Sequence, residues 1–169
     1  AHAYSYARMQ HAAHALRAAG SSTDTTKLSL NNLLLWVVDS GCTQHMTPHS
    51  ADVHHTRSSN MSITGISKGN DLHAKSVGSS SFPLPGVSTP VQMNNVLHIP
   101  DLPCRLLSVK AATKYDVEFT FFKTRPNGVS GHIRFPGVSQ PAPMYLVQNH
   151  YVLCLPARQT ALFNEPLSP

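Results

Sequence analysis

An aspartate at the end of the most apolar run in this sequence is the residue best placed to do chemistry. Leu33 to Val38 are six consecutive apolar residues, and Asp39-Ser40-Gly41 follows them directly. A short apolar run that ends in β-branched residues before a glycine predicts a strand buried on both faces. A carboxylate at the end of such a strand has to be hydrogen-bonded, paired with a cation or used in acid–base chemistry. Asp39 is therefore the first candidate catalytic residue, and a turn-capping acid is the structural alternative.

Three segments of the sequence resemble one family. Residues 36–46 (WVVDSGCTQHM) are similar to the signature of retropepsin-type aspartic proteases, two apolar residues followed by Asp, Ser or Thr, and Gly; their longer form looks like the copia-type retrotransposon branch. Residues 95–109 (NVLHIPDLPCRLLSV) resemble that family's NVLYVPDLPxNLLSV segment, in the same order and at a similar distance. Residues 144–147 (MYLV) resemble its following GLYLL strand. The resemblance covers roughly residues 35–147.

The resemblance implies an aspartic endopeptidase that cleaves an extended polyprotein segment and needs no cofactor. Such enzymes use two carboxylates about 3 Å apart that share one proton, one as general base on water and one as hydrogen-bond donor to the scissile carbonyl. This sequence has a single Asp-Ser/Thr-Gly triplet. A two-fold symmetric homodimer with Asp39 from each chain would complete the pair. The expected partners are thus a second copy of the chain and an extended peptide substrate.

The residues after Asp39 take their expected roles from the same resemblance. Ser40 matches the position whose hydroxyl bonds across the dimer axis, and Gly41 lets the backbone turn closely behind the acid. Thr43 matches a Ser/Thr position that bonds back to the loop. Cys42 stands where Ala is usual, as a small and largely apolar replacement. By the same resemblance, a glycine-tipped hairpin called the flap is expected between residues 61 and 78.

Zinc binding is a rival interpretation of the same stretch. Cys42, His45 and His49, with His54 and His55 close behind, are residue types that ligate zinc. Their spacing fits no standard zinc finger, and there is no second cysteine pair nearby. Histidine-rich polar loops are more often simply solvated, so we expect no metal.

The pattern of the remaining segments predicts an all-β chain, with strands at 91–99 and 106–109 and a hairpin around the Pro126-Asn127-Gly128 turn. Together with the resemblance it favours a small closed barrel of the retropepsin-like acid-protease type, with one short helix near 109–115. Helix-like spacing also predicts a peripheral N-terminal helix before Gly20. The expected organisation is an N-terminal helix and linker (1–32), a β domain (33–155) and a C-terminal tail (156–169).

Composition limits the other classes of function. The formal charge of +5 arises from 13 Lys and Arg against 8 Asp and Glu, without a packed basic run, so direct nucleic-acid binding is not expected. No segment is apolar enough to span a membrane. Three cysteines without CxxC spacing favour a reducing, intracellular compartment such as the cytoplasm, although the acid-poor N-terminus also resembles an organelle-import sequence.

A second function stays open beside the protease. The N-terminal segment, the C-terminal segment and the flap region do not match the family closely. The alternative is a domesticated, catalytically silent protease-like domain that serves as a structural or binding subunit of a larger assembly.

Overall fold

The computed structural model describes residues 33–64, 71–84, 87–124, 128–147 and 149–156 of the chain. This part of the chain consists mainly of strands with one short α-helix, which confirms the all-β prediction. The elements are β1 (Leu33–Asp39), β2 (Met46–Thr47), a 3-10 helix (Ser50–Asp52), β3 (His54–Ser58), β4 (Ser62–Ile63), β5 (Leu72–His73), β6 (Ser76–Phe82), β7 (Val91–His98), β8 (Arg105–Ser108), α2 (Val109–Thr113), β9 (Glu118–Phe121), β10 (Val129–Arg134), β11 (Ala142–Val147) and β12 (His150–Pro156).

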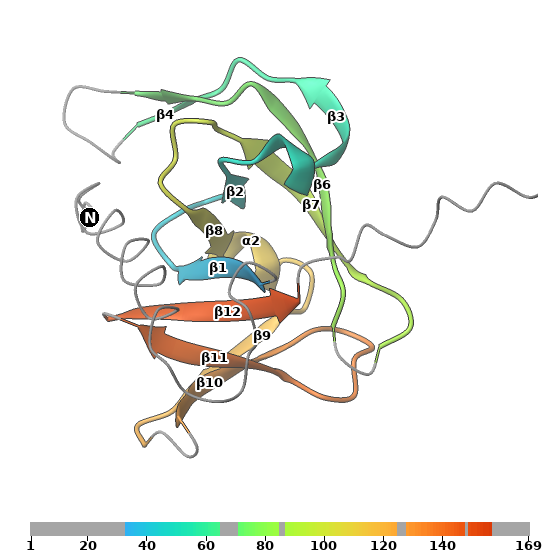
Figure 1. Ribbon diagram of the computed structural model, residues 1–169, viewed down its shortest axis with the longest axis vertical. Helices are drawn as coiled ribbons and strands as arrows, with labels where there is room; N and C mark the ends of the chain where they lie inside the picture. Colours follow the sequence, from blue (N-terminus) through green and yellow to red (C-terminus); the bar gives the residue numbers. More distant parts are fainter. Residues whose placement is uncertain (1–32, 65–70, 85–86, 125–127, 148, 157–169) are drawn as a thin grey trace, which may run out of the picture.

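Ten of these strands form one sheet, and β4 pairs with β5 separately. The order in the large sheet is β3-β6-β7-β2-β8-β1-β12-β11-β10-β9. Strand β1 lies inside it, between the parallel strand β8 and the antiparallel strand β12 (Figure 1). Since parallel strands end at the same edge of a sheet, Asp39 at the end of β1 lies opposite Ser108 at the end of β8.

Strand β1 is covered on both faces, as its apolar run predicts. Successive side chains of a strand point to opposite faces. Trp36 belongs to the larger of two hydrophobic clusters and Val37 to the smaller one, and both side chains are buried. Leu106 and Leu107 of β8 divide between the same two clusters. The two central strands, β1 and β8, therefore have a hydrophobic core on each face. These contacts fix the positions of both strands in the sheet.

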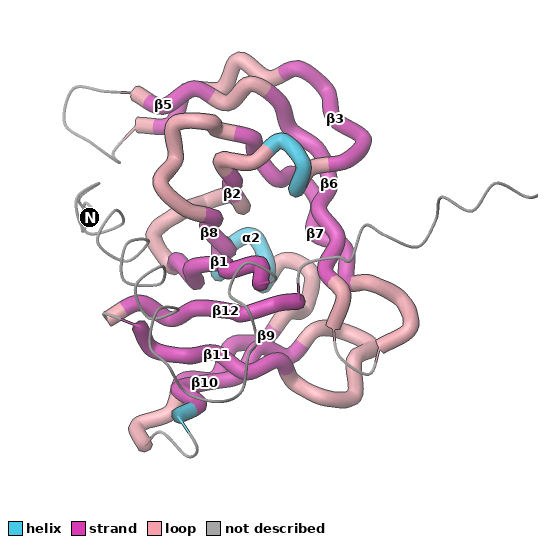
Figure 2. The backbone as a smooth tube through the Cα atoms, in the orientation of Figure 1, coloured by secondary structure: helices cyan, strands magenta, loops and turns pink. Residues whose placement is uncertain are grey.

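The large sheet bends around the larger cluster. Phe82 and Val96 come from β6 and β7, whereas Ile133 and Leu153 come from β10 and β12, and all four are fully buried in that cluster. Figure 2 shows β3, β6 and β7 in one half of the molecule and β9 to β12 in the other, with β1 and β8 between them. The ring of Trp36 meets that of Phe82 edge to face at 5.1 Å between centroids, which joins the central strand to the first half.

The predicted closed barrel is not observed. Within the described part of the chain, β3 and β9 are the two edges of the large sheet, and no pairing joins them. Closure requires the two edge strands to meet in a matched register. Here the bend packs side chains of the two halves against each other instead, so a shared core takes the place of the missing ladder.

Most of the locally predicted elements lie close to their expected positions. The strand at 91–99, the strand before residue 109 and the short helix after it correspond to β7, β8 and α2. The predicted hairpin around the Pro126-Asn127-Gly128 turn is formed by β9 and β10. In the flap region Ser62 pairs with His73, so a short hairpin is present, but residues 65–70 lie outside the described residues.

Two predicted segments lie outside the described residues: the N-terminal helix and linker (1–32) and residues 157–169 of the C-terminal tail. The three-part organisation of the chain therefore stays a prediction. In the described ranges, no helix has the length and apolar character needed to cross a membrane.

Candidate functional site

The candidate site is the turn that follows β1. Asp39 is half-buried, while Ser40 and Gly41 are exposed beside it. The backbone N–H of Gly41 donates a hydrogen bond of 2.7 Å to Asp39 Oδ1. This bond bends the chain back over the carboxylate and leaves Oδ2 free of that contact, so Asp39 does cap its turn. Capping and catalysis are compatible, because a main-chain donor also holds the carboxylate in one orientation.

Ser108 fastens this turn to the end of β8. Its hydroxyl donates to the carbonyl oxygen of Cys42 at 2.8 Å and accepts the N–H of Ala111 at 3.0 Å. The second contact is the N-cap of α2. One fully buried hydroxyl thus starts the helix and holds the Asp39 turn.

The side chain of His45 bonds to the main chain of Ser108 and so also helps to position the turn. The N–H of Ser108 donates to His45 Nδ1 at 3.1 Å. Burial of the ring lowers the pKa of His45 from 6.5 to about 4, so the ring is neutral near pH 7. Because Nδ1 accepts, the neutral ring carries its proton on Nε2. His45 therefore acts as a fixed acceptor that positions the loop, a role that its sequence did not disclose.

The two cysteines nearest the turn are inert thiols. Burial, followed by the charge of Asp39, raises the pKa of Cys42 to about 12. The same two causes raise the pKa of Cys104 to about 11. Because the thiolate is the reactive form, neither sulfur is activated as a nucleophile.

The predicted site residues are therefore only partly brought together. Asp39, Ser40 and Gly41 form one turn, whereas the exposed side chain of Thr43 lines a hollow shared with α2 and β7. Asp39 does not line that hollow. The hollow that Thr43 lines thus does not include Asp39, and the expected bond of Thr43 to the loop stays a prediction.

For the zinc alternative, the structure can be searched only over the residues that it describes. In the described ranges, no group of three or more His, Cys, Asp or Glu side chains is arranged to hold a metal ion. The nitrogen of His45 nearest the loop is already engaged by Ser108.

An ion pair at the start of β8 stabilises the elements that surround the site. Arg105 donates through Nε to Asp52 Oδ2 at 2.6 Å and through Nη2 to Oδ1 at 3.1 Å. The hydroxyl of Thr47 also donates to Asp52 Oδ2. The side chains of Arg105 and Asp52 are 17% and 9% exposed, so water screens this two-pronged pair little. It ties the 3-10 helix and β2 to the start of β8, which runs alongside β1.

Comparison with known protein families identifies the family that part of this chain resembles. Residues 36–117 match the family model described as the beta-barrel domain of Pol polyprotein. The matched segment runs from β1 through the Asp39 turn to the residue before β9, and so includes Ser108 and His45. No curated protein matches the chain. The match supports a segment of a retrotransposon polyprotein as the origin of this chain.

Proposed function

We propose that this chain is the aspartic protease segment of a copia-type retrotransposon polyprotein, active as a homodimer with one Asp39 from each chain. The observation that carries the proposal is the position of Asp39. It ends a strand buried on both faces, its carboxylate is held by the N–H of Gly41, and the Leu106-Leu107-Ser108 strand lies parallel beside it. A half-buried carboxylate that a main-chain hydrogen bond holds in one orientation is suited to general acid–base catalysis.

The second carboxylate has to come from another copy. Like charges about 3 Å apart cannot both ionise, so a pair of Asp39 side chains would share one proton. One would activate water for attack on the peptide carbonyl, and the other would donate a hydrogen bond to the carbonyl oxygen. The exposed Ser40 side chain, next to Asp39, is available to a partner chain across a two-fold axis.

The substrate in this proposal is an extended peptide held by main-chain hydrogen bonds. The hairpin of β4 and β5 supports this expectation, since it pairs apart from the large sheet and could close over a peptide. The chain would work in a reducing intracellular compartment, because all three of its cysteines are free thiols.

A silent structural subunit is the second candidate. One specific observation favours it: the turn of a single chain presents one carboxylate, so a monomer would have half a catalytic pair. Oligomeric state and activity therefore separate the two candidates.

The direct test replaces the carboxylate itself. Asp39→Asn should abolish cleavage of a polyprotein-derived peptide while preserving fold and dimer, because the amide keeps the shape but cannot act as a base. Asp101→Asn, at an exposed loop position, is the matched control and should cleave at the wild-type rate. Cleavage that survives in Asp39→Asn would remove Asp39 from the mechanism.

A further inference from the structure

Two neighbouring hollows, which together we call the groove, lie against the residues that follow the Asp39 turn, Thr43 in one lining and His45 in the other. These two hollows, of about 360 Å³ and about 340 Å³, share Asn94 and Tyr115 in their linings. Tyr115 is 52% exposed, so its ring forms part of an open wall. Since Asp39, Ser40 and Gly41 line neither hollow, the groove is separate from the proposed catalytic site.

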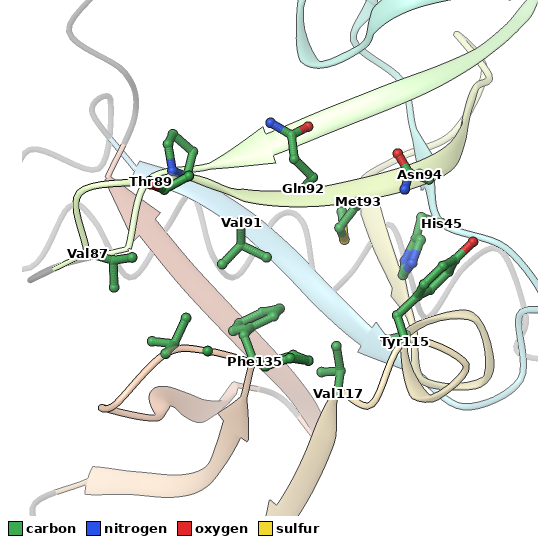
Figure 3. A pocket seen from close by; sticks show the side chains of 15 residues that line it. His45, Val87, Thr89, Val91, Gln92, Met93, Asn94, Tyr115, Val117 and Phe135 are labelled. Carbon is green, nitrogen blue, oxygen red and sulfur yellow. The ribbon is translucent and has the colours of Figure 1, made fainter.

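One half of the groove, which we call the apolar half, is lined mainly by apolar side chains. Figure 3 shows Val91, Val117 and Phe135 pointing toward a common space, with Val87 at one end and His45 and Tyr115 at the other. Asp, Glu, Lys and Arg are absent from the lining of this half, and His45 is neutral near pH 7. This apolar half would take an aliphatic or aromatic side chain.

The other half is basic. Arg57 of β3 and Lys110 and Lys114, within and just after α2, line it together, and its lining includes no acid. None of these three cations forms an ion pair with a residue in the described ranges. Three unpaired cations around one hollow attract an anionic group.

A polar step separates the two halves. The register of β6 and β7 shifts between Gly78 and Ser80, so Asn94 and Asn95 lie opposite the single residue Ser79. The Ser79 hydroxyl donates to Asn94 Oδ1 at 3.1 Å, which leaves the amide nitrogen of Asn94 for a ligand. An amide at this step suits the main chain of a bound peptide.

We propose that this groove binds a short peptide segment of a partner protein, with an apolar side chain in the apolar half and carboxylates in the basic half. Charge complementarity favours this occupant. A nucleic-acid strand carries a charge on every unit, and the apolar half would leave its phosphates without partners. A fatty acid would place its alkyl chain in the apolar half and its carboxylate in the basic half. Its alkyl chain would, however, form no hydrogen bonds with the side-chain amides of Asn94 and Asn95.

The test measures fluorescence anisotropy of the full chain against an array of labelled peptides. Each peptide carries Leu-Phe, a variable glycine spacer and Glu-Glu, and a matched peptide carries Gln-Gln instead. The best acidic peptide should bind about tenfold more tightly than its Gln-Gln counterpart, because two ion pairs are lost with the carboxylates. Added salt should weaken the acidic peptide selectively.

Substitutions in each half of the groove test which part of the peptide that half binds. The double variant Lys110→Glu/Lys114→Glu should weaken binding of the acidic peptide by about tenfold or more, because attraction becomes repulsion. Lys123→Glu, an exposed cation outside the groove, is the control and should bind like wild type. Val138→Ser should weaken both the acidic and the Gln-Gln peptide, since it acts on the apolar half. Thermal melts of each variant check the fold.

Three results would overturn the proposal. The first is an array in which no acidic peptide binds more tightly than its Gln-Gln partner. The second is unchanged binding in the folded Lys110→Glu/Lys114→Glu variant. The third is displacement of the peptide by oligothymidylate or oleate that binds more tightly at the same residues, which would assign the groove to nucleic acid or to a lipid. None of these results depends on proteolysis, so the proposed function is tested separately.

Discussion

At the scale of single residues, the Asp39 turn depends on one serine and one histidine that have no catalytic role of their own. Ser108 donates to the Cys42 carbonyl, and His45 accepts from the Ser108 N–H. Both residues are at most 2% exposed, so water cannot replace either bond. The geometry of Asp39 is thus set by groups that stay neutral at pH 7.

The buried His45 predicts a specific pH dependence of stability. Its pKa falls from 6.5 in the unfolded chain to about 4 in the folded one, so below pH 6.5 the unfolded chain binds a proton that the folded chain does not. The unfolding free energy should therefore decrease from pH 6.5 toward pH 4. Between pH 7 and pH 5 this one group should cost about 2 kcal/mol.

Urea denaturation of wild type and His45→Asn at several pH values measures this effect. Asparagine keeps an acceptor near the position of Nδ1 but does not titrate. The variant should lose about 2 kcal/mol less than wild type between pH 7 and pH 5, because the carboxylates titrate alike in both proteins. Parallel curves for the two proteins would show that His45 is not the titrating group.

Ser40 should matter for dimerisation and not for the fold of one chain. Its exposed hydroxyl has room for a partner, and in the proposed dimer it bonds across the axis. Ser40→Ala should raise the dimer dissociation constant and lower the cleavage rate while the melting temperature of the monomer stays the same. A dissociation constant and rate equal to those of wild type would exclude the role across the axis.

At the scale of elements, the carboxyl ends of β1 and β8 and the start of α2 form one unit. Parallel pairing sets Asp39 opposite Ser108, and the same serine caps the helix. The Arg105–Asp52 pair then fixes the other end of β8. A displacement of α2 would consequently move the Asp39 turn.

Ser108→Ala tests this coupling. The substitution removes the N-cap of α2 and leaves the Cys42 carbonyl without its donor, which together should lower the unfolding free energy by about 2 kcal/mol. Ser139→Ala, at an exposed loop position, should change it by less than about 0.5 kcal/mol. Cleavage by Ser108→Ala should also slow under conditions in which the variant is still folded. Wild-type stability and a wild-type cleavage rate in this variant would mean that the hydrogen bonds of the Ser108 hydroxyl are not needed for either.

At the scale of the whole molecule, the open sheet and the single carboxylate both leave surfaces that a second protein chain could complete. The strands β3 and β9 leave two edges of the sheet unpaired within the described chain, and the Asp39 turn presents half of a catalytic pair. A homodimer joined near the turn would complete the pair, whereas the silent subunit would pair with other proteins.

Sedimentation of the chain at several concentrations, with and without a peptidomimetic aspartic-protease inhibitor, distinguishes these cases. The proposed protease should show a dimer that depends on concentration and is tightened by the inhibitor, because the inhibitor binds only the complete pair. The Asp39→Asn variant should still dimerise but respond less to the inhibitor. A strict monomer indifferent to the inhibitor would favour the silent subunit.

The sequence by itself determined the local features of this protein. The apolar run before Asp39 and the Leu106-Leu107 strand each carry a short-range pattern, as do the strands on either side of the predicted turn near Gly128, and each of these strands is present where its pattern lies. Alternation, turn chemistry and burial on both faces depend on neighbouring residues, so they can be read along the chain.

Only the tertiary structure decided which distant residues meet. Ser108 lies 63 positions from His45, and Arg57 is nearly as far in sequence from Lys114, so no local pattern could predict the Ser108–His45 hydrogen bond or the basic half of the groove. The open sheet was missed for the same reason. Whether two edge strands pair or remain apart depends on how the two halves pack over their shared core, and that balance is a property of the whole chain.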